Sequence, residues 1–336
     1  MNRFSRAAAA ALLLGCIVVP QTLRAAVRAE CLSAPSKILG HPVAYCVILP
    51  PSYDAEKTRR YPVLYLLHGL GDNEQMLIHS GGFNLVQDLW ERRQLGDFLI
   101  VTPDGGSSFY INSRDGRLRY EDFFLQEFLP QIEKRYRAQS GRAYRGIAGI
   151  SMGGYGALHL AFRHPELFGS VGAHSAALLE KLPSVTVSDY RQTVRSRIFG
   201  DVFGSPLDPA FWKQNDPLAI ARTARLAGLH IYFDCGSEDD FGFDAGAVAL
   251  DKALGSRHIP HEFHLYPGGH NWVYVAEHLP ALLQFHFRVF ESAAHSQIRL
   301  DDGARNERRC SGIAAGSVMR KRGLTFPERG APPHLV

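Results

Sequence analysis

The chain has 336 residues, 46% of them hydrophobic, which suits one large domain and excludes a disordered, collagen-like or disulfide-dense chain. The formal net charge of +4 resides in the two ends, because residues 30–291 hold 25 of the 37 bases and 29 of the 33 acids. A mildly acidic body gives no support for a nucleic-acid partner.

The first 29 residues have the order of a secretory signal peptide. Arg3 and Arg6 precede an apolar run over residues 7–20, and alanine-rich cleavage sites follow between Ala25 and Ala29. The run is shorter than the about 20 residues of a membrane-spanning helix, so we expect no stable membrane span. We expect a periplasmic or secreted protein, and Cys16, which ends the stretch L-L-G-C, leaves a lipoprotein as a minor alternative.

Three further cysteines bear on the fold. Cys31 and Cys46 flank a predicted β-hairpin around residues 39–41. An oxidising compartment would permit a disulfide between them, and two unpaired thiols near the surface are the alternative. Cys235 lies in an apolar strand, where we expect a small core residue.

Strand and helix patterns alternate between residues 30 and 291. Short apolar runs typical of strands buried on both faces occupy residues 43–49, 62–67, 98–102, 144–150, 170–174, 229–233 and 261–266. Apolar spacings of three and four predict helices over residues 84–92, 121–136, 154–163, 245–254 and 274–290. This alternation predicts an α/β fold with a mostly parallel central sheet and helices on both faces.

Two segments depart from the alternation. Residues 176–226 are rich in Pro, Asp and aromatic residues, and we interpret them as a cap-like insertion that forms a wall of the site. A surface connection is the alternative. Residues 292–336 are rich in Gly, Arg, Ser and Pro and lack apolar periodicity, so we expect a disordered basic tail there.

The strongest chemical signal is G-I-S-M-G over residues 149–153, a match to G-x-S-x-G. In this motif a strand turns sharply into a helix with the serine at the strained apex, and the flanking glycines leave room for the turn. The predicted strand before the motif and the helix after it supply that context. Ser151 is therefore the candidate nucleophile, and the Met152 N–H is a candidate oxyanion donor.

A serine nucleophile needs a base and an orienting carboxylate, which follow it in the chain order Ser, acid, His. His270 follows the last predicted strand in a glycine-rich loop, so it is the candidate base. Around the end of the strand at residues 229–233 the acids are Asp234, Glu238, Asp239 and Asp240. Asp239 is favoured because it lies a few residues past the strand end, within reach of the histidine loop.

The second oxyanion donor should come from the loop after an early strand. Residues 68–71 read H-G-L-G and follow the strand 62–67 directly, so we expect the Leu70 N–H to join that of Met152. His68 is expected to hold this loop. We predict no metal site, because His258, His261 and His264 have no Cys or carboxylate partner at ligand spacing. The serine chemistry implies no cofactor.

Five segments together resemble the esterase family that contains esterase D-type S-formylglutathione hydrolases, feruloyl and acetylxylan esterases and mycolyltransferases. They are Y-L-L-H-G-L-G-D (65–72), P-D-G-G (103–106), G-I-A-G-I-S-M-G-G-Y-G-A-L (146–158), G-S-E-D (236–239) and G-G-H-N-W (268–272). The resemblance implies an α/β-hydrolase fold over residues 30–291. It also implies a triad of Ser151, Asp239 and His270, with Leu70 and Met152 as oxyanion donors.

The expected function is that of an exported serine carboxylic-ester hydrolase that forms an acyl-enzyme on Ser151. Export favours an acyl or feruloyl ester of a carbohydrate, or a small ester, as substrate. Acyl transfer of the mycolyltransferase type is the main alternative. An S-formylglutathione hydrolase and a non-catalytic binding protein on the same fold are weaker ones, and the sequence does not predict an oligomeric state.

Overall fold

The computed structural model describes residues 27–180 and 199–318. Within these ranges, eight strands form one sheet in the order β1-β2-β4-β3-β5-β6-β7-β8. They are β1 (Arg28–Ala34), β2 (Val43–Leu49), β3 (Val63–Leu67), β4 (Leu99–Pro103), β5 (Arg145–Ile150), β6 (Ser170–His174), β7 (His230–Gly236) and β8 (Glu262–Tyr266). Strands β3 to β8 run parallel to one another, whereas β2 runs antiparallel to both β1 and β4.

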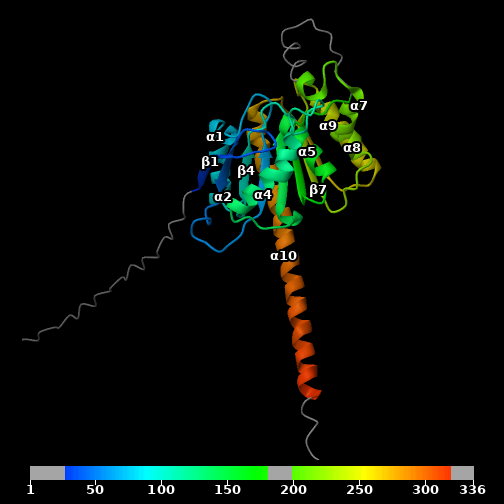
Figure 1. The fold of residues 1–336 in the computed structure, drawn as a ribbon. Coiled ribbons are helices and arrows are strands. Elements are labelled where there is room, and N and C mark those ends of the chain that lie inside the picture. Colours follow the sequence, from blue (N-terminus) through cyan, green and yellow to red (C-terminus); the bar gives the residue numbers. More distant parts are fainter. Residues whose placement is uncertain (1–26, 181–198, 319–336) are drawn as a thin grey trace, which may run out of the picture.

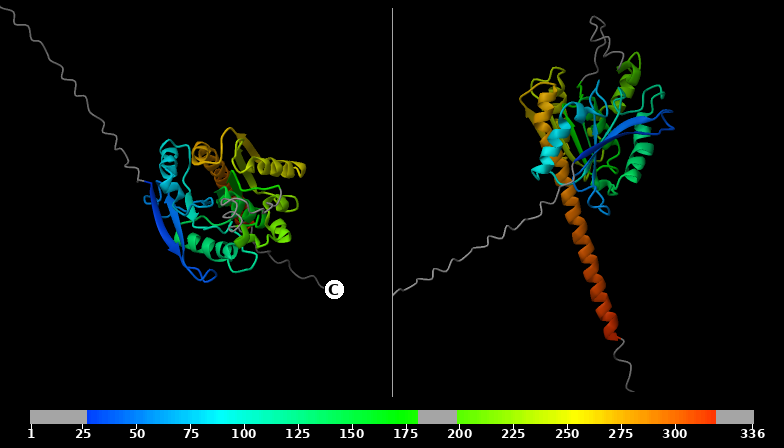
Figure 2. Two further views of the ribbon diagram at one scale, coloured as in Figure 1. Left: turned by 90° about the horizontal axis from the view of Figure 1, so that it is seen from above. Right: turned by 90° about the vertical axis from the view of Figure 1, so that its left-hand side faces the viewer.

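Helices cover both faces of this sheet (Figure 1, Figure 2). One face carries α1 (Met76–His79), α2 (Gly82–Glu91) and α10 (Trp272–Val318). The other carries α3 (Tyr120–Phe123), the π-helix η1 (Phe124–Phe128), α4 (Leu129–Arg135), α5 (Met152–Arg163), α7 (Pro209–Asn215), α8 (Pro217–Ala221) and α9 (Phe243–Ser256). A short 3₁₀-helix, η2 (Arg142–Tyr144), precedes β5.

Alternation along the strands produces two apolar cores. In β3, Leu64 and Leu66 pack on the α2 and α10 side, whereas Tyr65 and Leu67 pack on the α4 and α5 side. All five residues of β3 are buried, as a central strand covered by helices requires. The α/β-hydrolase fold predicted from the sequence is confirmed.

The seven predicted strands correspond to β2 through β8 of the eight observed strands. Residues 43–49 and 170–174 coincide with β2 and β6, and most other ends differ by one residue. The exception is β7, which continues three residues past its predicted end, to Gly236, because Asp234 pairs with both β6 and β8 and the pairing with β8 continues to Gly236. That extension places Asp234 inside a strand.

Strand β1 forms one edge of the sheet, and the sequence analysis did not predict its bounds. Strand β1 begins at Arg28, within the segment 1–29 assigned to a signal peptide, while residues 1–26 and Cys16 lie outside the described residues. The β1–β2 hairpin, dark blue in Figure 2, places Cys31 directly opposite Cys46. The two form a disulfide, and Cys235 is a buried free thiol.

The carboxyl-terminal segment differs from the expected disordered tail. Helix α10 continues without interruption to Val318 and extends well beyond the body of the domain (Figure 1). No proline occurs between Pro280 and Pro327, and Ala and Arg, both strong helix formers, are frequent after residue 292. Extension of a helix already nucleated on the core therefore outweighs the lack of apolar periodicity. Residues 319–336 lie outside the described residues.

The carboxyl ends of the parallel strands meet at one edge of the sheet. The loops after β3, β5, β6, β7 and β8 all lie there, and they carry the residues that the sequence singled out. None of the described helices combines the length and apolar character needed to cross a membrane.

Candidate active site

Ser151 occupies a sharp turn between β5 and α5. Its backbone has φ 56° and ψ −115°, a conformation that residues other than glycine rarely adopt. A Cβ at Gly149 would lie 2.2 Å from the Gly153 backbone carbon, and a Cβ at Gly153 would lie 2.1 Å from the Leu67 carbonyl oxygen. The motif needs glycine at both positions because the backbones pass too close for any side chain.

The three side chains of the predicted triad are in contact. His270 Nε2 lies 3.0 Å from Ser151 Oγ, and His270 Nδ1 lies 2.7 Å from Asp239 Oδ2. The Asp239 carboxylate is fully buried, whereas the His270 side chain is 15% exposed. This arrangement supplies a nucleophile, a base that can take its proton, and a carboxylate that fixes the base with Nδ1–H toward Asp239.

Asp239 is held by more than its histidine. Its Oδ1 accepts hydrogen bonds from the backbone N–H of Phe241 (2.9 Å) and of Phe243 (3.5 Å), and the Cys235 thiol lies 3.6 Å from Oδ2. Burial alone would raise the pKa of Asp239, but the hydrogen bonds from His270 and the two backbone groups outweigh it and lower the pKa. The carboxylate is therefore charged at neutral pH.

Two backbone N–H groups are available for an oxyanion near Ser151. Met152 is the first residue of α5, and first-turn N–H groups have no partner within their helix. Leu70 lines the same cavity as Ser151, and its N–H donates no hydrogen bond to any described residue. Both predicted donors are thus free to bind a developing negative charge.

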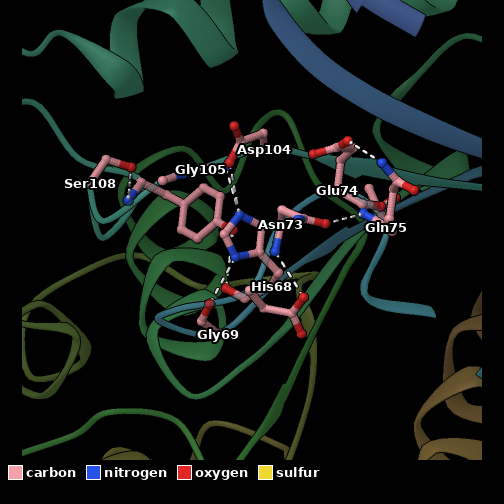
Figure 3. A network of polar contacts seen from close by, with 12 residues as sticks. His68, Gly69, Asn73, Glu74, Gln75, Asp104, Gly105 and Ser108 are labelled. Atoms are coloured by element: carbon pink, nitrogen blue, oxygen red, sulfur yellow. Dashed lines mark hydrogen bonds and ion pairs between the residues drawn. The ribbon is translucent and has the colours of Figure 1, made fainter. Parts of the chain in front are cut away.

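His68 fixes the loop that carries Leu70 (Figure 3). Its Nδ1 donates to the Gly69 carbonyl (2.8 Å), and its Nε2 accepts from the Gly105 N–H (2.8 Å). The ring is completely buried, and its Nε2 lies 3.4 Å from Asp104 Oδ1. His68 therefore holds two loops together, as the sequence led us to expect.

A cavity of about 270 Å³ opens beside Ser151 and His270. Its apolar lining comes from the loop after β3, the start of α1, the end of β5 and the first turn of α10, through Leu70, Met76, Ile150, Trp272 and Val275. Polar groups are contributed by Asp72, Ser175 and Asn271. The cavity can accept a moderately large apolar group attached to a carbonyl at Ser151.

The described part of the insertion at residues 176–226 does not line this cavity. Instead, Phe203 and Trp212 pack on Tyr155 of α5, whose hydroxyl donates to the Asn215 carbonyl (2.9 Å). These residues therefore support the helix that follows Ser151. Residues 181–198 lie outside the described residues, so a wall of the site formed by the insertion stays a prediction.

The described residues contain no cluster of three or more His, Cys, Asp or Glu side chains that could hold a metal ion. His261, one of the three closely spaced histidines, lies 2.9 Å from Asp251 Oδ1 and stacks on Phe233.

A second carboxylate–histidine pair lies near the triad, and sequence reasoning missed it. Asp234 looked like a spare loop acid, but its side chain is wholly buried with that of His174, at 2.6 Å between Oδ2 and Nδ1. The Tyr274 hydroxyl donates to Asp234 Oδ1 (2.7 Å). The sequence signal that could have found this pair is the position of Asp234 directly after the apolar run at residues 229–233. A strand one residue longer than predicted would include Asp234 and could bury it.

Comparison with known proteins agrees with this architecture. A family model described as "Putative esterase" matches residues 36–286. Esterase Rv1288 from Mycobacterium tuberculosis is 32% identical over 242 residues, which are 67% of this chain and 51% of that protein. The chain thus spans about half the length of this curated relative.

Two further relatives differ in their printed activities. The diacylglycerol acyltransferase/mycolyltransferase Ag85B from Mycobacterium leprae is 27% identical over 222 residues, 60% of each chain. The solved structure of a ferulic acid esterase has a TM-score of 0.67 at 29% identity, and the match covers 79% of this chain and 99% of that one. The family match and the shared fold show that the chain belongs to the esterase family of that model, a family of α/β-hydrolase enzymes.

Proposed function

We propose that the protein is an exported serine esterase that hydrolyses carboxylic esters through an acyl-enzyme on Ser151. The observation that carries this proposal is the hydrogen-bonded series of Ser151, His270 and the buried Asp239. Family membership supports the reaction class, and the role of each residue is our assignment.

In the proposed mechanism, Ser151 Oγ attacks the ester carbonyl while His270 Nε2 takes the hydroxyl proton. Asp239 stabilises the imidazolium that forms, and the N–H groups of Leu70 and Met152 bind the tetrahedral oxyanion. The oxyanion collapses, the C–O bond to the leaving alcohol breaks, and His270 returns its proton to that alcohol. Water, deprotonated by His270, then cleaves the acyl-enzyme by the same steps in reverse.

For the substrate, we propose an acyl or feruloyl ester of a carbohydrate, or a small ester. The cavity beside Ser151 supports this choice, because Met76, Trp272 and Val275 give it an apolar lining suited to an acyl group. The structural similarity to a protein described as a ferulic acid esterase also supports an aromatic acyl group.

Export is supported by two observations. The first residues have the charge and apolar order of a signal peptide, and Cys31 and Cys46 form a disulfide, which persists in oxidising compartments. Expression of the full chain in a bacterial host, followed by fractionation and mass determination of the amino terminus, tests this. We expect cleavage within residues 25–29; an uncleaved cytoplasmic protein would contradict export.

A second candidate is acyl transfer to an alcohol, favoured by the similarity to a mycolyltransferase. The two reactions share the acyl-enzyme and differ in the acceptor. Adding a sugar or glycerol during turnover separates them, since a transferase forms acylated acceptor faster than free acid.

To test the hydrolase proposal, residues 27–336 are assayed with p-nitrophenyl acetate, p-nitrophenyl butyrate and methyl ferulate, beside Ser151→Ala. We expect kcat/KM to fall by at least about 10⁴-fold in the variant. The ranking of the three esters reports the preferred acyl group. Equal rates for the wild type and Ser151→Ala on every ester would overturn the proposal.

A further inference from the structure

A row of three buried polar side chains runs beside the triad. Tyr274 lies in the first turn of α10, Asp234 lies in β7 and His174 is the last residue of β6. The Tyr274 hydroxyl donates to Asp234 Oδ1 (2.7 Å), and Asp234 Oδ2 lies 2.6 Å from His174 Nδ1. All three are at most 3% exposed. We refer to Tyr274, Asp234 and His174 as the buried row.

The His174 end of the buried row contacts the nucleophile. Asp234 and His174 face each other in the parallel register of β6 and β7, and their side chains are held at ion-pair distance, although the angles fall outside those of a hydrogen bond. The backbone carbonyl of His174 accepts a hydrogen bond from the Ser151 N–H (2.9 Å). The position of the strained Ser151 backbone therefore depends on the end of β6.

The Tyr274 end of the buried row contacts the loop of the base. A Cβ at Gly268, two residues before His270, would lie 2.8 Å from the Tyr274 ring, so the ring packs directly on that loop. The Tyr274 N–H also donates to Asn271 Oδ1 (3.1 Å). The buried row thus connects the loop of His270 to the backbone of Ser151 by a path that does not pass through the triad.

Burying the polar groups of the buried row in the core costs free energy. A buried carboxylate loses its hydration and is retained only with partners, and replacement of buried ionic groups by apolar ones is often neutral or stabilising. Burial and the neighbouring Asp234 raise the pKa of Tyr274, so its hydroxyl stays protonated and remains a donor. The geometry indicates a role for the buried row, because its two ends contact the segments that carry His270 and Ser151, and such groups must be held within about 0.5 Å of their productive geometry.

We propose that Tyr274, Asp234 and His174 are positioning residues that hold the His270 loop and Ser151 at the 3.0 Å separation needed for proton transfer. The inference rests on the proposed roles of Ser151 and His270. Misplacement of reacting groups by about 1 Å can cost about 100-fold in rate. Loss of the connection should therefore lower kcat more than it changes KM.

The test is Tyr274→Phe in the whole protein, which removes one oxygen and keeps the ring on Gly268. With p-nitrophenyl acetate we expect kcat to fall by about 10- to 100-fold and KM to stay within about twofold. Labelling of Ser151 by a fluorophosphonate should slow by a similar factor. The matched control is Tyr65→Phe, because the Tyr65 hydroxyl is also buried but has no partner among the described residues and lies in the core with Phe124 and Phe128.

A merely structural role would lower the melting temperature of Tyr274→Phe and leave the kcat of the folded enzyme unchanged, whereas Tyr65→Phe, which removes a buried hydroxyl that no described residue pairs with, should change neither quantity much. Hydrogen exchange adds a readout that does not need turnover: peptides covering residues 268–274 and 149–153 should exchange faster in Tyr274→Phe than in Tyr65→Phe. If Tyr274→Phe does not fold, Asp234→Asn replaces it, since an amide still accepts the Tyr274 hydrogen bond but loses the charge beside His174.

The outcomes separate the two proposals. A wild type that is inactive and unlabelled contradicts the proposed function, and the positioning role falls with it. An active wild type whose folded row variant has wild-type kcat and wild-type exchange contradicts the positioning role alone.

Discussion

Asp239 contributes both a charge and an orientation to the proposed site, so it offers the sharpest single-residue test. Asp239→Asn keeps the size of the side chain but removes the charge that stabilises imidazolium. We expect kcat to fall by roughly 10³- to 10⁴-fold with little change in fold. The exposed neighbour Asp240 is the control, and Asp240→Asn should retain the wild-type kcat. Equal activities of the two variants would reject Asp239 as the triad acid.

Glycine at position 153 is a second residue-scale test. An alanine Cβ there would lie 2.1 Å from the Leu67 carbonyl oxygen, so the turn at Ser151 must shift. We expect Gly153→Ala to lose about 2 kcal/mol or more in free energy of unfolding, with loss of activity. Gly255, in α9, has open space around its Cβ position, so Gly255→Ala should be stabilising by about 0.5–1 kcal/mol. Denaturant melts of both variants measure these changes in the free energy of unfolding, and a Gly153→Ala variant as stable as the wild type would contradict the prediction.

At this scale the sequence was informative about the site. The predicted residues Ser151, Asp239 and His270 lie in contact. They could be predicted because a local motif, the chain order of the fold and the strand ends each leave few candidates. Asp234 was missed because its burial depends on how far β7 pairs with both neighbours, which is a tertiary property. The catalytic roles themselves stay a proposal.

Between elements, a buried carboxylate connects α3 to α5, the helix that follows Ser151. Glu121 lies 3.1 Å from His159 Nε2 and 3.0 Å from His164 Nε2. Burial alone would raise the pKa of Glu121, but hydrogen bonds from both histidines outweigh it and lower the pKa strongly. Glu121→Gln should therefore cost about 3 kcal/mol in free energy of unfolding at neutral pH.

The sign of the pH dependence follows from that lowered pKa. A carboxyl group with a lower pKa in the folded state stabilises the protein above its unfolded pKa, 4.5 for glutamate, and this contribution is lost as the pH falls. The stability difference between the wild type and Glu121→Gln should accordingly narrow below about pH 4.5. Urea melts at several pH values measure it, and a difference that widens in acid would contradict the assignment.

Elements with strong periodicity were predictable, and their ends were less so. Strand β2 was placed to the residue because seven apolar residues are bounded by turns. The extension of α10 past residue 292 was not, because propensity and nucleation, rather than an apolar face, sustain it.

For the whole molecule, the body and the projecting part of α10 should be separable. Among the side chains that the structure describes, the last buried apolar ones of α10 are Val289 and Phe290, and the next residues are largely exposed. A stop after Glu291 should leave kcat/KM within about twofold and the free energy of unfolding within about 0.5 kcal/mol. Thermal melts and ester assays compare it with the longer chain. A large loss of stability would show that the projecting helix packs on the body.

The central claim is that Ser151 is a nucleophile activated by His270. The most direct measurement is covalent labelling with a fluorophosphonate, followed by mass spectrometry of the labelled peptide. We predict one label on Ser151 in the wild type, none in Ser151→Ala, and much slower labelling in His270→Gln. A folded wild type that takes up no label at Ser151, or a label rate indifferent to His270, would contradict the account.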